Sequence, residues 1–122
     1  MEQNKITENI IGGCINVHKE LGPGLLESIY ESALCIEFDE IGLKYQRQKS
    51  LPVTYKNKKI GDFRIDLLVE DSIVLELKSV ERFDPIFEAQ ILSYMKLGDY
   101  KVGLLINFNS KLLKDGIKRF II

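Results

Sequence analysis

The chain has 122 residues, which is enough for one domain with a hydrophobic core of its own and too few for two. Hydrophobic residues make up 45% and charged residues 29%, an ordinary globular composition, and no apolar run approaches the ~20 residues of a membrane-spanning helix. The polar, acidic N-terminus does not resemble a secretory signal, and we expect Cys14 and Cys35 to be buried free thiols. These features predict a single cytoplasmic domain over residues 1–122, without a membrane segment.

The net charge of −1 conceals a strong asymmetry along the chain. Residues 1–43 carry two basic and eight acidic side chains, whereas residues 44–64 carry seven basic side chains and one acidic one. Residues 101–122 are basic again, with five basic side chains and one acidic one. Two interpretations are open: the basic segments form a phosphate-binding surface around an acidic centre, or the lysines of residues 56–59 only solvate a hairpin tip and protect an edge strand.

Two helices are predicted at the start of the chain. Apolar residues recur at helical spacing over residues 3–21, and the Gly-Pro-Gly of residues 22–24 ends this helix. A second helix is predicted over residues 25–41, and Gly42 is its expected stop. His18, the only histidine, lies on the apolar stripe of the first helix, so we favour a structural role, or one behind the metal ligands, over that of a direct ligand.

Strands and one further helix are predicted in the rest of the chain. The strands cover residues 45–55, 60–69, 73–80 and 101–108, a short fifth strand covers 117–122, and the helix covers 85–97. Pro52 indicates that the first strand lies at an edge of the sheet, and Asp84 before Pro85 is typical of a helix start. A strand, a helix and a strand in succession favour a parallel pair with a right-handed crossover. The order ααβββαβ therefore predicts an α/β fold, a mixed β-sheet core flanked by helices.

Alternation along the second strand predicts that Ile65, Leu67 and Val69 share one face, with Asp66 on the other. Glu76 holds the corresponding position on the third strand. A three-residue loop between the strands would put Asp66 directly across from Glu76, whereas a two-residue loop would separate them unless a bulge restored the register.

The two carboxylates are the residues that point most directly to a function, because a charge inside an apolar strand is costly unless something compensates it. An amphipathic hairpin with one wet face is the alternative. Opposed like charges on a partly apolar face instead favour a bound cation, and carboxylate oxygens suit Mg²⁺ or Mn²⁺. Lys78 follows Glu76 by two residues and points to the same side of the strand.

These residues resemble motifs of the PD-(D/E)xK nuclease superfamily, and the resemblance extends from about Ile11 to Phe108. In chain order the motifs are the GxxExxY pattern of a small bacterial and archaeal branch at residues 24–30, the acidic pattern at Asp66 and residues 76–78, the QxxxY pattern at residues 90–94, and a closing strand at residues 102–108. Ile65 stands where the name of the superfamily has proline, a common departure. The resemblance implies a restriction-endonuclease-like fold.

The resemblance also implies roles at the acidic pattern. Asp66 and Glu76 would bind the metal ion, together with the backbone carbonyl of Leu77. Lys78 would orient or activate the attacking water and stabilise the charge that develops on the phosphate.

Three further residues receive roles from the resemblance, each with a plainer alternative. Glu27 would make a further or water-mediated metal contact, although an acidic residue at a helix start is also explained by the helix dipole. Gln90 and Tyr94 would line the site and position the nucleic acid, although on their own they would be read as a hydrogen-bonded core pair.

The expected function is therefore metal-dependent hydrolysis of DNA, with Mg²⁺ or Mn²⁺ as cofactor, in repair, recombination or defence. Two alternatives use the same fold without catalysis. One is a nucleic-acid-binding module that uses the basic segment 44–64, and the other is an interaction module, such as a homodimer.

Overall fold

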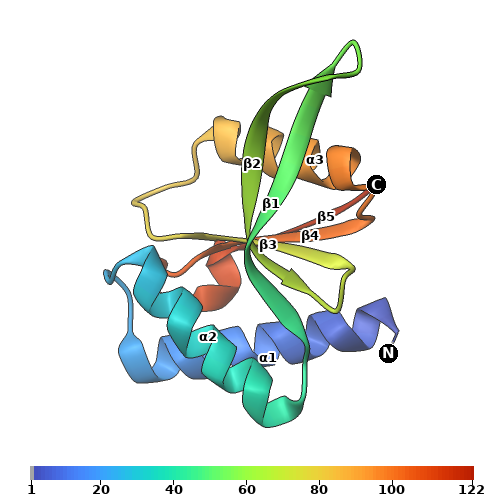
Figure 1. The fold of residues 1–122 in the computed structure, drawn as a ribbon. Helices are drawn as coiled ribbons and strands as arrows, with labels where there is room; N and C mark the ends of the chain where they lie inside the picture. The colour runs from blue at the N-terminus through green and yellow to red at the C-terminus, as the bar shows by residue number, and fades with distance from the viewer. Residues whose placement is uncertain (1) are drawn as a thin grey trace.

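The computed structural model describes residues 2–122 and shows a five-stranded sheet with helices on both faces (Figure 1). The elements in chain order are α1 (Gln3–Leu21), α2 (Glu27–Ile41), β1 (Tyr45–Tyr55), β2 (Lys58–Val69), β3 (Ile73–Lys78), α3 (Pro85–Gly98), β4 (Val102–Asn107), the 3₁₀ turn η1 (Leu113–Gly116) and β5 (Ile117–Ile121). The predicted α/β fold and the predicted element order are confirmed.

The strands lie in the sheet in the order in which they occur in the chain. Neighbouring strands are antiparallel except for β3 and β4, which are parallel and joined through α3. This confirms the predicted parallel pair of strands. It also leaves β1 and β5 as the edge strands, and Pro52 lies on β1, where a missing backbone N–H costs least.

Two hydrophobic clusters hold the layers together, one on each face of the sheet. The larger packs α1 and α2 against one face, and the smaller packs α3 against the other (Figure 1). Every residue of β4 is buried, as expected for a central parallel strand that is covered on both sides. The alternation of β3 decides the side of the site: Leu75 and Leu77 belong to the larger cluster and Val74 to the smaller, so Glu76 points toward α3.

The helix α3 starts and packs as its sequence predicts. The Asp84 carboxylate accepts a hydrogen bond of 2.9 Å from the N–H of Ile86, and Pro85 occupies the first helical position. The helix also lies unusually close to β4: a Cβ atom on Gly103 would come within 2.6 Å of the Met95 sulfur. Glycine at 103 therefore allows α3 to approach the sheet.

The helix α2 begins at Glu27, two residues later than predicted. Leu26 has extended backbone geometry, and the loop before it is held by Tyr30, whose hydroxyl donates to the carbonyl of Gly22 at 2.6 Å. Tyr30 is fully buried and stacks on Phe108 at 4.3 Å between ring centroids. This anchor sets the position of the first turn of α2, where Glu27 lies.

The hairpin of β1 and β2 extends far beyond the rest of the sheet. These strands have 11 and 12 residues, whereas β3 has six. The base of the hairpin packs on α3 through buried Leu51 and through Phe63, whose ring lies 5.0 Å from that of Tyr94. Beyond this base the hairpin projects away from the domain (Figure 1).

Two smaller predictions concern the cysteines and the membrane. Cys14 and Cys35 are buried and unpaired, as predicted. Within residues 2–122, no helix has the length and apolar character needed to cross a bilayer.

Candidate active site

The candidate site lies where β2 separates from β3. The two strands pair from Val69 and Ile73 to Leu67 and Leu75, and the loop between them has three residues, 70–72. This is the loop length that the functional interpretation requires. Past Leu67 the strands diverge, and a fork opens in the sheet.

Asp66 and Glu76 fill this fork, one from each strand. The N–H of Asp66 donates to Glu76 Oε2 at 2.8 Å, and the N–H of Leu77 donates to Asp66 Oδ2 at 2.8 Å. Each carboxylate therefore replaces a carbonyl that a continuous sheet would supply to the neighbouring strand. The reciprocal bonds fix the two carboxylates opposite each other and use one oxygen of each.

Regular alternation fails along β2 at the fork. Leu67 packs in the cluster under α1 and α2, whereas Ile65 packs in the cluster under α3. The prediction that these two side chains share a face is therefore wrong. The physical reason is that β2 loses its β3 partner here and turns with β1 toward α3. Gln48, the residue across from Asp66 on β1, has a φ of 50°, so both strands depart from regular geometry at the site.

Burial gives the carboxylate pair unusual proton affinities. The Glu76 side chain is almost fully buried, and this burial, followed by the charge of Asp66, raises its pKa to about 8. Burial also raises the pKa of Asp66, and the Leu77 N–H and the Lys78 charge partly offset the effect. Two buried carboxyls that resist ionisation side by side form a site that a cation would stabilise.

The carboxylate pair fits a hard divalent cation in its donor chemistry. No group of three or more His, Cys, Asp or Glu side chains among residues 2–122 is arranged to hold a metal ion. Mg²⁺, however, commonly binds through one or two carboxylates and keeps several waters. Asp66 and Glu76, with the Leu77 backbone beside them, meet that requirement.

Lys78 lies on the same side of β3 as Glu76, as predicted. Its ammonium is 4.4 Å from the ring centroid of Phe87 on α3, and its charge lowers the pKa of both Asp66 and Glu76. The site thus contains two carboxylates and one ammonium group at a single fork.

The segment that carries Lys78 is fixed by a residue whose role the sequence analysis missed. Asn107 is buried at the end of β4, where its side chain accepts from the N–H of Val80 at 3.1 Å and donates to the Val80 carbonyl at 2.9 Å. The N–H of Phe108 also donates to the Lys78 carbonyl at 2.9 Å. A polar residue at the end of an otherwise apolar strand was the available signal.

Glu27 reaches the site from the first turn of α2. Its carboxylate accepts a hydrogen bond of 3.1 Å from the N–H of Ser79, the residue after Lys78, and its charge contributes to the raised pKa of Glu76. A hollow of about 280 Å³ is lined by Glu27 together with Leu26 and Ser79. Glu27 is thus exposed to solvent on one side and close enough to the carboxylate pair for its charge to act on Glu76.

Tyr94 and Gln90 differ in their relation to the site. Tyr94 is nearly buried, and its pKa is raised first by burial and then by the charges of Glu76 and Asp66, so it lies beside the pair. Gln90 is exposed one helical turn earlier on α3, and its side-chain amide makes no hydrogen bond with any described residue. The structure thus brings Tyr94 to the carboxylates and leaves Gln90 on the helix surface.

His18 lies in a different contact. Its Nε2 is 2.8 Å from the carbonyl oxygen of Ser110, and the imidazole donates there in the Nε2–H tautomer. The contact ties α1 to the loop after β4, which supports the structural role favoured for His18.

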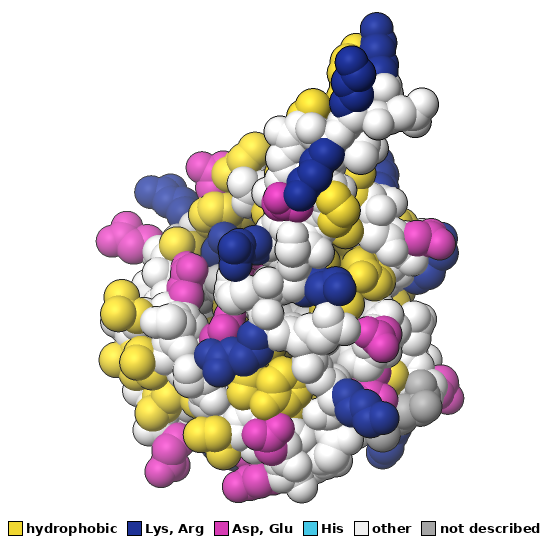
Figure 2. All heavy atoms as spheres, in the orientation of Figure 1, with side chains coloured by type: hydrophobic (Ala, Val, Ile, Leu, Met, Phe, Trp, Pro, Cys, Tyr) yellow, Lys and Arg dark blue, Asp and Glu magenta, His cyan; other side chains and the backbone are white. Residues whose placement is uncertain are grey.

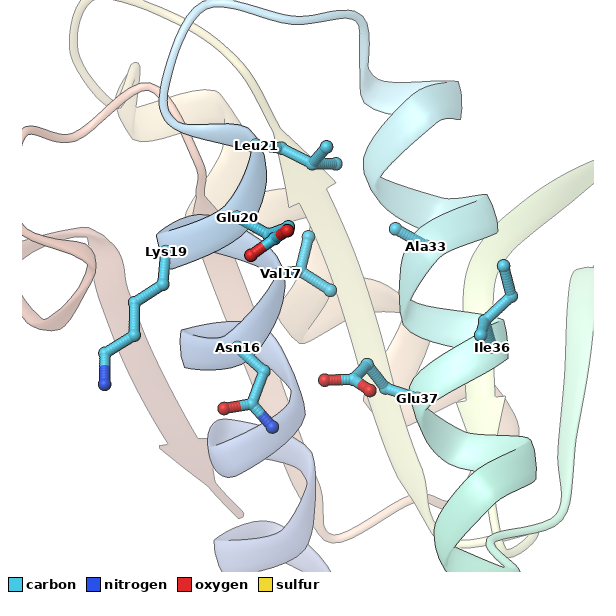
Figure 3. A pocket seen from close by; sticks show the side chains of 8 residues that line it. All are labelled: Asn16, Val17, Lys19, Glu20, Leu21, Ala33, Ile36 and Glu37. Atoms are coloured by element: carbon cyan, nitrogen blue, oxygen red, sulfur yellow. The ribbon is translucent and has the colours of Figure 1, made fainter.

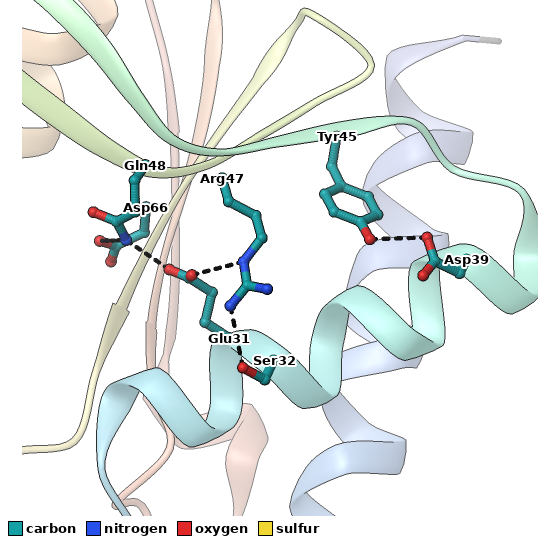
Figure 4. A network of polar contacts seen from close by, with 7 residues as sticks. All are labelled: Glu31, Ser32, Asp39, Tyr45, Arg47, Gln48 and Asp66. Atoms are coloured by element: carbon teal, nitrogen blue, oxygen red, sulfur yellow. Dashed lines mark hydrogen bonds and ion pairs between the residues drawn. The ribbon is translucent and has the colours of Figure 1, made fainter.

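A second polar network borders the fork on the α2 side, and the sequence analysis missed it (Figure 4). Glu31 is buried and accepts from Arg47 at 3.0 Å and from the Gln48 amide at 2.7 Å. The same Gln48 nitrogen lies 3.5 Å from Asp66 Oδ1. The signal was the spacing of Glu31 from Glu27, one helical turn along α2.

The hollow between α1 and α2 is not part of the site. It has a volume of about 460 Å³, and Figure 3 shows Glu20 and Glu37 directed into it, with Lys19 directed away. None of its lining residues belongs to the fork. It is a surface groove between two helices.

A mixed sheet between helices, with an acidic pair and a lysine at a strand fork, is an arrangement that can support divalent-cation chemistry on an anionic substrate. The family model of the PD-(D/E)XK nuclease superfamily matches residues 4–120, and the chain belongs to this superfamily. Its members are in general nucleases that act on nucleic acids and typically use divalent metal ions. No curated protein and no solved structure matches the chain.

Proposed function

We propose that this protein is a deoxyribonuclease that hydrolyses phosphodiester bonds with Mg²⁺ or Mn²⁺ as cofactor. The observation that carries the proposal is the carboxylate pair of Asp66 and Glu76, held opposite each other by reciprocal hydrogen bonds, with Lys78 beside it. Membership of the nuclease superfamily supports the reaction class.

Asp66 and Glu76 would hold the metal ion, and the Leu77 carbonyl would complete the protein's share of the ligands. A bound divalent ion supplies a nucleophilic water at neutral pH and neutralises charge on the phosphate. The Lys78 ammonium would orient that water and stabilise the developing negative charge, because it projects to the same side as Glu76. Asn107 would act through its two hydrogen bonds to Val80, two residues after Lys78, and so keep Lys78 in position.

The remaining predicted site residues would act on the substrate side of the pair. Glu27 would contact the metal through water or orient a second water, because it lies at the opening to solvent. Tyr94 would border the reacting phosphate, and exposed Gln90 would contact the nucleic-acid strand once it is bound.

A cleavage assay with matched variants tests the proposal. Purified protein is incubated with labelled single-stranded, double-stranded and branched DNA in Mg²⁺, in Mn²⁺ and in EDTA. We expect metal-dependent cleavage that Asp66→Asn and Lys78→Ala each reduce at least ~10²-fold, as for the loss of one strong electrostatic group. Lys114→Ala, an exposed lysine on η1, is the control and should cleave normally. Activity that survives in both site variants would show that the fork is not the active site.

The basic hairpin favours one alternative function, a nucleic-acid-binding module without catalysis. Such a module would bind DNA in EDTA, lose affinity steeply with salt and cleave nothing in either metal. The buried carboxylates weigh against it, because a phosphate-binding surface gains nothing from two acidic groups in its sheet.

Several finer assignments accompany the proposal. We assign the chain to the GxxExxY branch on the pattern of residues 24–30, and we treat residues 1–122 as one catalytic domain. Repair, recombination or defence is the expected process, and the unpaired Cys14 and Cys35 suit the reducing cytoplasm. Homodimer formation is tested by measuring the molar mass in solution with and without DNA.

A further inference from the structure

The projecting end of the β1–β2 hairpin, residues 52–62, has no packing role in the domain. We call this segment the arm. Every residue of the arm except Val53 is exposed, and the smaller core cluster ends at Leu51 and Phe63, just before it. A two-stranded hairpin alone is marginally stable in water. The arm therefore contributes little to the fold.

The tip of the arm is narrow and displays apolar side chains to solvent. Lys56 and Asn57 both have positive φ, as in the tight two-residue turns of hairpins, and the pairing register shifts at Val53, which leaves Ile60 outside the ladder. Ile60 and Tyr55 are 67% and 63% exposed, so the arm presents two large apolar side chains to solvent next to its lysines. The arm is therefore a narrow two-stranded ribbon with exposed apolar side chains near its tip.

The arm is also strongly basic. Lys56, Lys58 and Lys59 cluster at its tip, and Figure 2 shows Lys and Arg side chains along the projection. Asp62 is its only acid and pairs with Lys59 at 3.1 Å, whereas Lys58 has no ion-pair partner among the described residues. In a chain with a net charge of −1, this concentration of positive charge selects a polyanion.

The arm and the carboxylate pair share the strand β2, which fixes their spacing. From Lys58 to Asp66 the chain advances eight residues and spans roughly 26 Å in extended conformation. Along a nucleic-acid strand, at about 3.4 Å per phosphate, this corresponds to roughly eight nucleotides. A ligand held at both places must be a polymer of at least that length.

We propose that the arm is a duplex grip: it enters the major groove of double-stranded DNA and places its lysines on phosphates about eight base pairs from the bond at Asp66 and Glu76. A two-stranded β-ribbon fits the major groove, and a single strand offers no groove for it. The proposal deepens the nuclease function and rests on it for the identity of the reacting bond.

Binding in the absence of cleavage tests the grip. All proteins carry Lys78→Ala, the buffer contains EDTA, and affinity is measured by fluorescence anisotropy with duplexes of about 6 and about 20 base pairs and a single strand of about 20 nucleotides. The arm variant combines Lys56→Gln, Lys58→Gln and Lys59→Gln. The control removes the same charge from exposed lysines outside the arm, with Lys5→Gln, Lys19→Gln and Lys96→Gln.

On the long duplex, we expect the arm variant to bind at least ~10-fold more weakly than its parent and to show a salt slope that is smaller by about two to three, because three phosphate contacts are lost. The control variant should keep the parent's slope. On the short duplex, parent and arm variant should bind alike, since the tip does not reach it. Circular dichroism should show equal melting temperatures, because the substituted side chains are exposed.

Equal affinity and slope for parent and arm variant on the long duplex would overturn the grip, and so would an equal loss on the single strand. If the arm variant differed from its parent in molar mass in solution but bound DNA equally well, the grip would be overturned in favour of a contact between protein copies. The expected binding pattern, with no cleavage by the wild-type protein in Mg²⁺ or Mn²⁺, would uphold the grip and reject the nuclease. Cleavage that is insensitive to the arm variant, with equal binding, would reject the grip alone.

Discussion

At the scale of single residues, the proposed chemistry depends on two carboxyl groups that the fold buries against each other. Asp66 and Glu76 are buried side by side, and each is retained by a backbone N–H of the opposite strand. Sheet geometry alone would satisfy those N–H groups with carbonyls. The fork therefore replaces regular strand pairing with two buried carboxylates, a local cost of the kind that functional sites often carry.

The raised pKa of Glu76 predicts a pH-dependent stability for the metal-free protein. The unfolded-state pKa is near 4.5 and the folded-state pKa about 8, so the carboxyl contributes its full stability below 4.5. That contribution is lost as the pH rises toward 8, by on the order of 5 kcal/mol. Urea unfolding in EDTA between about pH 5 and about pH 9 should show this decline.

Glu76→Gln is the test variant for this prediction, because its amide does not titrate. It should flatten the decline, whereas Glu81→Gln, an exposed residue in the loop after β3, should leave it unchanged. Excess Mg²⁺ should restore stability at high pH through preferential binding to the folded state. A decline of equal size in Glu76→Gln would assign the effect to another group.

Asn107 yields a second prediction at this scale. Asn107→Ala removes a buried side chain with hydrogen bonds to both backbone groups of Val80, so we expect it to destabilise the protein by about 2–4 kcal/mol. Urea unfolding measures the loss, and Asn16→Ala, an exposed site on α1, should cost less than about 0.5 kcal/mol. An equal loss of unfolding free energy in the two variants would show that the segment after β3 does not depend on Asn107.

At the scale of secondary-structure elements, α3 closes one side of the site and its position depends on Gly103. Tyr94 and Phe87 come from α3, and they border the carboxylates and Lys78. A glycine on β4 permits the close approach, since any larger side chain would meet Met95 and Ile91. Packing between a helix and a strand thus sets the depth of the site.

Gly103→Val should therefore destabilise the protein by about 1–3 kcal/mol through overpacking. A double-mutant cycle with Gly103→Ala and Met95→Ala gives a sharper measurement. The cavity left by Met95→Ala should accommodate the new methyl group, so the double variant should be more stable than the sum of the single effects predicts. Strict additivity would mean that the two residues do not meet.

At the scale of the whole molecule, the protein combines a covered central sheet with an uncovered arm. The strands β3 and β4 are buried on both faces, whereas the arm is almost fully exposed. We expect hydrogen exchange followed by mass spectrometry to show this division. Amides of β4 should exchange only through global unfolding, and those of residues 54–61 should exchange by local opening.

Saturation with a duplex of about 20 base pairs should slow exchange in residues 54–61 if the arm grips DNA, and it should leave η1 unaffected. The measurement uses the Lys78→Ala protein in EDTA, so that the duplex stays intact. Exchange in the arm that is as slow as in β4 without DNA would contradict the independence of the arm from the core.

Most of the fold was accessible from local patterns. Helical spacing, the Asp84–Pro85 start and the strand-helix-strand order predicted the elements, and hydrogen bonding confirmed the start of α3 and the parallel pair. The start of α2 was less accessible, because the Tyr30 anchor that sets it reaches back to Gly22. The face on which Ile65 lies was inaccessible for a similar reason, because it depends on the point at which β2 stops pairing with β3.

The amino-acid sequence was enough to single out the groups to which we assign the chemistry, because charges stand out in apolar strands and their spacing resembles a nuclease pattern. The surroundings of Asp66, by contrast, follow from how the chain folds. Glu31 and Gln48 come from separate elements and meet at Asp66 only after the sheet has forked and α2 has packed beside it. A sequence pattern reports only on residues that are neighbours along the chain. The burial and the pKa of a side chain depend instead on residues that folding brings together from distant parts of the chain.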